Sequence, residues 1–282
     1  MTHAEAHGRF FPLDEHGYIV NDTSHSYFPA EFGQRLVGAF QHAFPSGLRA
    51  VYLRGSVARG TFVPHLSDLD AFAVLDDACP TEPLAIEAAL AAELRTLLPG
   101  VTELEFTTCH EYEVLGNYLG VWPFFIKTQS LLLYGVDYAS LLAPYRPGVA
   151  IMGEALWLPQ RVAEYQRRLI QPEWQAKPQF LCEWMMKAVV RAAFELTMEQ
   201  QHCYTRDLAL CCQVFCMQYP HQAGLCRQAM AWAISPDEDL AGQQRLLGEF
   251  CPWIEKQSKR LMVEYRLDPT DYHLAPAGEG AP

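Results

Sequence analysis

The sequence has little that would place it in a membrane or on nucleic acid. Across its 282 residues no apolar run approaches the roughly 18 residues that a membrane-spanning helix needs. The first ten residues, MTHAEAHGRF, contain no apolar stretch of the kind found in a secretory signal. Basic residues number 21 against 33 acidic ones, a formal net charge of −12, whereas sequence-independent nucleic-acid binding requires a positive surface. We therefore expect a soluble, cytoplasmic protein with no membrane partner.

Metal-type spacing is also missing among the cysteine and histidine residues. Nine cysteines are present, and none falls into the paired motifs typical of zinc sites. Cys211, Cys212 and Cys216 lie in a helical, apolar context, where free thiols behave as small hydrophobic side chains. An odd cysteine count without a secretory signal predicts reduced thiols in a cytoplasm.

The chain is half hydrophobic and is expected to fold into two different domains. Strand patterns occur only in the first part, and beyond about residue 150 the apolar periodicity is helical throughout. This order predicts a small mixed-sheet α/β domain followed by an all-α helical bundle. The expected divisions are an irregular lead-in at 1–28 within a first domain at 1–150, a helical domain at 151–270 and a disordered tail at 271–282.

Periodicity and breakers set the expected elements, and residues 112–125 receive no assignment. The predicted strands are Leu48–Arg54, Leu69–Leu75 and Val101–Thr108. The predicted helices are Glu31–Phe44, Leu84–Leu98, Gly153–Ile170, Gln179–Gln201, Thr205–Met217, His221–Ile234 and Asp237–Arg266, with a linker at Pro172–Pro178.

The segment Leu53–Val74 combines a glycine-serine turn with a closely spaced pair of aspartates. Gly55 and Ser56 end one strand and open a short helix, where backbone N–H groups can hold a phosphate. Asp68 and Asp70 stand two residues apart at the next strand, so their side chains project to the same side. Two such carboxylates repel each other unless a cation lies between them. Mg²⁺ takes oxygen ligands of this kind when it also holds substrate phosphates.

A third acidic position lies on the strand predicted at Val101–Thr108. Its sequence, VTELEFTT, alternates with a period of two. Glu103 and Glu105 fall on one face, and Leu104 and Phe106 fall on the other. Alternation alone therefore leaves both glutamates open as a partner for the aspartate pair.

These residues together resemble the nucleotidyltransferase superfamily of DNA polymerase β. Its motif is hydrophobic-Gly-Ser, a gap, Asp-hydrophobic-Asp, and a third carboxylate on a later strand. Here Gly55 and Ser56 are followed, after eleven residues, by Asp68-Leu69-Asp70, and Glu105 fits the third place. The resemblance implies that the three carboxylates are catalytic and bind Mg²⁺, with two ions expected.

The resemblance also implies nucleotide contacts in the same half of the chain. Arg59 stands in an Arg-Gly pair common in the superfamily, and Ser67 precedes the aspartates as in its motif. With Gly55 and Ser56, these are the candidate contacts to a bound nucleotide. Glu103 remains the rival for the third carboxylate.

The second half resembles the helical domain of aminoglycoside 3″/9 adenylyltransferases. The resemblance is carried by LLLYGVDY at 131–138 and by VVRAAFELTMEQQHCYTRDLALC, which begins at position 189. In those enzymes an arginine and a later lysine reach the triphosphate, and Arg191 and Arg206 stand near the matching places. Lys187 and Tyr204 are further candidates for binding the nucleotide.

The resemblance implies a Mg²⁺-dependent transferase that moves a nucleoside monophosphate from ATP or another nucleoside triphosphate to an acceptor hydroxyl. A small, cationic, aminoglycoside-like acceptor is favoured, and the acidic net charge disfavours nucleic acid. One alternative is a nucleotidyltransferase that modifies tRNA or a protein side chain, as toxins of this superfamily do. Another is a non-catalytic nucleotide-binding module.

Overall fold

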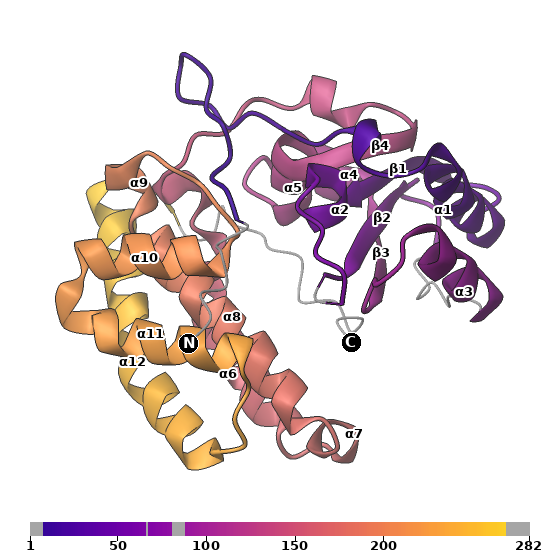
Figure 1. Ribbon diagram of the computed structural model, residues 1–282. Coiled ribbons are helices and arrows are strands. Elements are labelled where there is room, and N and C mark those ends of the chain that lie inside the picture. The colour runs from indigo at the N-terminus through magenta and orange to yellow at the C-terminus, as the bar shows by residue number, and fades with distance from the viewer. Residues whose placement is uncertain (1–7, 66, 81–87, 269–282) are drawn as a thin grey trace. The chain divides into compact units, whose positions relative to one another are not determined.

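The chain folds into two units (Figure 1). One contains a mixed four-stranded sheet with its helices, and the other consists of helices. The computed structural model describes residues 8–65, 67–80 and 88–268. Of these, 19–145 form the sheet unit, and 8–18 together with 146–268 form the helical unit. The predicted disordered tail, 271–282, lies outside the described residues. Within the described part of the chain, no helix combines the length and apolar character needed to cross a bilayer.

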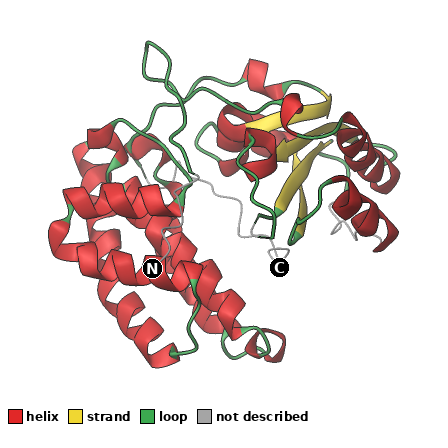
Figure 2. Ribbon diagram, in the orientation of Figure 1, coloured by secondary structure: helices red, strands yellow, loops and turns green. Residues whose placement is uncertain are grey.

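The sheet has the strand order β3-β2-β1-β4, and Figure 2 shows its strands in yellow. β1 pairs antiparallel with both β2 and β4, whereas β2 and β3 run parallel. The predicted bounds of the first two strands are confirmed. The strands are β1 (Leu48–Arg54), β2 (Leu69–Leu75), β3 (Leu104–His110) and β4 (Ser130–Gly135).

Alternating side chains of the strands build a core on each face of the sheet. On one face, α1 (Ala30–Ala43) and α3 (Ala88–Leu97) pack against residues such as Val51 and Leu53. On the other face, Tyr52 and neighbouring strand residues contact α4 and α5, which occupy the stretch that the sequence left unassigned. The remaining elements of this unit are η1 (His25–Tyr27), α2 (Gly55–Arg59), α4 (Glu111–Leu115), α5 (Val121–Gln129) and η2 (Tyr138–Leu141).

The helical unit is centred on α8, and most residues of this helix are buried. α6, α10 and α11 pack directly against it, and α12 packs on α6. The elements are η3 (Val149–Ile151), α6 (Gly153–Arg168), α7 (Pro172–Gln175), α8 (Pro178–Glu195), α9 (Met198–Gln201), α10 (Leu208–Gln218), η4 (Pro220–Gln222), α11 (Ala223–Ile234) and α12 (Leu240–Glu264).

One predicted helix is broken and one predicted strand is shifted. The helix expected at Gln179–Gln201 is divided because Thr197 donates both its amide N–H and its hydroxyl to the carbonyl of Phe194, which tightens the last turn of α8. The strand expected from Val101 begins three residues later, at Leu104. The backbone amide and hydroxyl of Thr102 donate to the carbonyl of Ser67, so Thr102 does not take part in the strand pairing of β2 and β3.

Two loop assignments also differ from the structure. The linker expected at Pro172–Pro178 contains the one-turn helix α7, with proline at its first position. The lead-in was expected to belong entirely to the first domain, but its residues 8–18 group with the helices. There the amide of Phe11 donates to the carbonyl of Tyr204, and Thr205 donates its hydroxyl to the carbonyl of Arg9.

Candidate active site

Three carboxylates come together at one edge of the sheet. Asp68 precedes β2, Asp70 lies within it, and Glu105 lies opposite Asp70 in the register of β3. One oxygen from each side chain lies within 4.8 Å of the others. The grouping arises because parallel pairing places register partners side by side with their side chains on the same face.

The strand register separates the two glutamates that alternation could not. Glu103 lies just before β3 with an exposed side chain, and its backbone carbonyl accepts a hydrogen bond from the amide of Leu69 at 2.9 Å. Glu105, two residues later, is the one whose carboxylate joins Asp68 and Asp70.

The electrostatics of the group favour a bound cation. Burial, followed by the charges of Asp70 and Asp68, raises the pKa of Glu105 to about 7. Asp70 itself is only 8% exposed. Three clustered carboxylates repel one another and cannot all stay ionised at low cost without positive charge among them. All of the donor atoms are hard oxygens, so the residues fit Mg²⁺.

The glycine-serine turn is shaped around the same aspartate. Gly55 has φ of +78°, and a Cβ at this position would lie 2.5 Å from Oδ2 of Asp70. Glycine is therefore needed both for the left-handed backbone and for the close approach of the carboxylate. The hydroxyl of Ser56 is buried and has no hydrogen-bond partner within the described part of the chain. A buried hydroxyl without a partner, one residue from the glycine that contacts Asp70, can serve a bound ligand.

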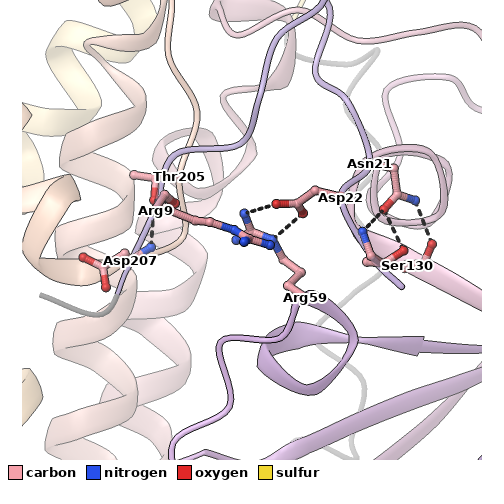
Figure 3. A network of polar contacts seen from close by, with 8 residues as sticks. Arg9, Asn21, Asp22, Arg59, Ser130, Thr205 and Asp207 are labelled. Atoms are coloured by element: carbon pink, nitrogen blue, oxygen red, sulfur yellow. Dashed lines mark hydrogen bonds and ion pairs between the residues drawn. The ribbon is translucent and has the colours of Figure 1, made fainter. Parts of the chain in front are cut away.

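Two other predicted nucleotide contacts have structural partners. Arg59 is turned toward Asp22 (Figure 3), with Nε donating to Oδ1 at 2.8 Å and Nη2 donating to Oδ2 at 3.1 Å. Its bidentate pairing and 7% exposure give Arg59 a role in holding the lead-in segment to α2. The hydroxyl of Ser67 accepts a hydrogen bond from the amide of Val63 at 2.9 Å, which stabilises the turn immediately before Asp68.

Arg54 belongs to the carboxylate group and was missed by the sequence reasoning. It is the last residue of β1 and the register partner of Asp70, and its Nη2 lies 2.9 Å from Oδ1 of that aspartate. The guanidinium also stacks over the ring of Phe125, at 4.8 Å from the centroid. The signal that could have found it is its position immediately before Gly55, where the superfamily pattern has a hydrophobic residue.

In the helical unit, arginines surround a partly buried glutamate, Glu154. Nη1 of Arg206 donates to Oε1 of Glu154 at 3.2 Å, and Nη2 of Arg161 lies 3.5 Å from its Oε2. Burial raises the pKa of Glu154, but the charges of Arg161, Arg206 and Arg191 outweigh it and the net shift is downward. We call Glu154, Arg161, Arg191, Arg206 and Glu195 the arginine cluster.

The arginine cluster carries surplus positive charge. Burial and the neighbouring charge of Arg206 lower the pKa of Arg191 to about 10, and its Nε makes no hydrogen bond to any described residue. Burial and the charge of Glu154 raise the pKa of Glu195, which favours its neutral form. Whether or not Glu195 is ionised, three arginines outnumber the carboxylates. The cluster therefore favours an anion.

The remaining two predicted contacts, Lys187 and Tyr204, have partners within the helical unit. Lys187 pairs with Glu183 one turn earlier on α8, with Nζ and Oε1 at 2.5 Å and both side chains more than a third exposed. Tyr204 is 3% exposed, and its ring lies 5.1 Å from that of Phe11. The positions favour a surface ion pair for Lys187 and core packing for Tyr204.

Comparison with known proteins gives a structural likeness without a sequence match. No family model matches the chain, and no curated protein matches it. Among solved structures, the chain is similar to spectinomycin adenyltransferase AAD(9) from Enterococcus faecialis, crystallised with ATP and spectinomycin. The TM-score is 0.50 and the identity 13%, with 81% of this chain and 98% of that chain covered. The fold is thus the one predicted: a small mixed-sheet α/β domain followed by an all-α helical domain.

Proposed function

We propose that this chain is a Mg²⁺-dependent nucleotidyltransferase that transfers AMP from ATP to a hydroxyl of a small, cationic acceptor. The observation that carries the proposal is the group formed by Asp68, Asp70 and Glu105, with Gly55 packed against Asp70. The fold supports it, since the structurally similar adenyltransferase was crystallised with ATP and spectinomycin.

In the proposed reaction, the acceptor oxygen forms a bond to the α-phosphorus of ATP and the bond to pyrophosphate breaks. The acceptor hydroxyl releases its proton to solvent, and pyrophosphate leaves. Asp68, Asp70 and Glu105 would hold the Mg²⁺. When bound, Mg²⁺ neutralises the negative charge that develops on the phosphates. The rigid strands β2 and β3 keep the three carboxylates in place before substrate arrives, which limits reorganisation during the reaction.

The arginine cluster and the buried hydroxyl of Ser56 would serve the phosphates. The Nε of Arg191, which has no hydrogen-bond partner among the described residues, can donate to a polyanion. We assign Arg191 and Arg206 to the triphosphate on this chemistry and on the resemblance of the helical segment. Arg59, Lys187 and Tyr204 are left out of this assignment because each has a structural role.

The test is a transfer assay with labelled nucleoside triphosphates and a panel of acceptors that includes spectinomycin and aminoglycosides. We expect Mg²⁺-dependent pyrophosphate release with ATP and at least one aminocyclitol-type acceptor. Asp70→Asn should lower the rate at least about a hundredfold, because it removes a charged ligand from the preorganised group. Binding of Mg²⁺ with ATP should raise the melting temperature of the parent protein but not that of this variant.

The same assay separates the alternatives. Transfer of label to tRNA or to protein, with none to the small acceptors, would contradict the proposed class of acceptor. It would still support nucleotidyl transfer as the reaction. Mg²⁺-dependent ATP binding without turnover on any acceptor would leave a nucleotide-binding module. Transfer by Asp70→Asn at the rate of the parent would contradict the proposed site itself.

A further inference from the structure

Three thiols from two helices converge in the helical unit. Cys212 and Cys216 are one turn apart on α10, so they share a face of that helix, and Cys226 lies on α11. α10 and α11 pack against each other (Figure 1). The three sulfur atoms lie within 4.8 Å of one another, and those of Cys212 and Cys216 are 3.8 Å apart. The sequence spacing had suggested no such grouping.

The sulfur separation suits a single thiolate-bound ion. At a metal–sulfur bond length of about 2.3 Å, coordinated sulfurs lie roughly 3.8 to 4.0 Å apart in tetrahedral or trigonal geometry. The helices already hold the Cys212–Cys216 pair at this separation. The third ligand would need only a small adjustment, since all three sulfurs are within 4.8 Å.

An open pocket gives access to the thiols. Its volume is about 430 Å³, and Cys212 and Cys216 line it together with Met217, Met230 and Arg227. Cys216 is half-buried, whereas Cys226 is fully buried. An ion can therefore enter from the pocket, and the Arg227 guanidinium supplies positive charge beside ligands that must lose their protons.

The composition of the pocket decides between metal ions. Among its described lining residues there is no carboxylate or imidazole, and the residues with sulfur other than Cys212 and Cys216 are Met217 and Met230. Thiolates and thioethers are soft ligands, which suit Cu(I), zinc and iron–sulfur clusters. Structural zinc sites and these clusters usually have four protein ligands, whereas only three thiols converge here, a number that suits trigonal Cu(I). We propose that Cys212, Cys216 and Cys226 form a binding site for Cu(I).

The test uses the full, reduced chain under anaerobic conditions, with Cu(I) supplied as its coloured bicinchoninate complex. We expect the parent protein to withdraw one equivalent of Cu(I) with a loss of the colour. Cys216→Ser should weaken the affinity at least tenfold, because loss of an outer-shell partner alone typically costs about 10- to 100-fold and this change removes a ligand. Circular dichroism would verify the helical content of each variant.

Cys203→Ser is the matched control, because Cys203 is also half-buried but lies outside the cluster. It should leave the Cu(I) affinity unchanged. Equal losses in Cys203→Ser and Cys216→Ser, or no withdrawal of Cu(I) by the parent protein, would overturn the site. A parallel titration with Zn²⁺ and a coloured zinc indicator tests the choice of metal. Uptake of Zn²⁺ that depends on Cys216, without uptake of Cu(I), would overturn the copper assignment.

Discussion

The carboxylate group of the sheet unit and the arginine cluster of the helical unit treat buried charge in opposite ways. The first gathers Asp68, Asp70 and Glu105, with the cation Arg54 on Asp70. The second gathers three arginines around Glu154 and Glu195, and burial raises the pKa of Glu195. Buried like charges are costly unless an opposite charge joins them. The first group therefore favours a bound cation, whereas the second favours a bound anion.

The sharpest test of the carboxylate group compares two neighbouring glutamates. Glu105→Gln should lower Mg²⁺-dependent transfer at least about a hundredfold, because it removes one of three clustered charges. Glu103→Gln changes the same residue type two positions away, on an exposed side chain, and should leave the rate unchanged. Steady-state kinetics and Mg²⁺ titration would measure both. Equal effects of the two variants would break the assignment of Glu105.

The anion preference of the arginine cluster can be tested on one helix. Arg191→Met should weaken ATP binding about 10- to 100-fold, the usual worth of a hydrogen bond to a charged group. Lys187→Met, which removes an exposed cation one turn earlier on α8, should change it by less than about twofold. Isothermal titration calorimetry with ATP and Mg²⁺ would measure both. Undiminished ATP affinity in Arg191→Met would show that the surplus charge serves the fold alone.

The smallest expected effect is on stability, and it comes from removing Arg54, the cation that pairs with Asp70 in the carboxylate group. Arg54→Met should lower the free energy of unfolding without Mg²⁺ by about 1–3 kcal/mol, because it leaves the buried Asp70 without its ion pair. Added Mg²⁺ should recover part of the loss. Arg49→Met is the control on the same strand, since Arg49 pairs with Asp76 but is 46% exposed, and its loss should be clearly smaller.

Urea denaturation with and without Mg²⁺ would measure these two variants. Recovery by Mg²⁺ in Arg54→Met but not in Arg49→Met would tie the effect to the carboxylate group. Equal losses that Mg²⁺ does not change would mean that Arg54 acts only as a packing residue.

Sequence patterns predicted the structure correctly where an apolar run and a turn residue lie next to each other in the chain. The bounds of β1 and β2 follow from their apolar runs. Gly55 directly follows β1, and Asp68 and Asp70 lie at the start of β2, where the sequence changes from polar to apolar. The helix breaks were harder to predict. The end of α8 depends on Thr197 turning its hydroxyl onto the carbonyl of Phe194, and nothing in the apolar period of that helix signals it.

The sequence alone determined the pair of aspartates, the glycine-serine turn and the order of a sheet followed by helices. These features depend on side-chain alternation and on residues a few positions apart. Only the tertiary structure chose Glu105 over Glu103, placed Arg54 on Asp70 and brought Cys226 to Cys212 and Cys216. The physical reason is that strand register and helix packing set lateral distances between residues far apart in the chain, and periodicity within one element carries no information about them.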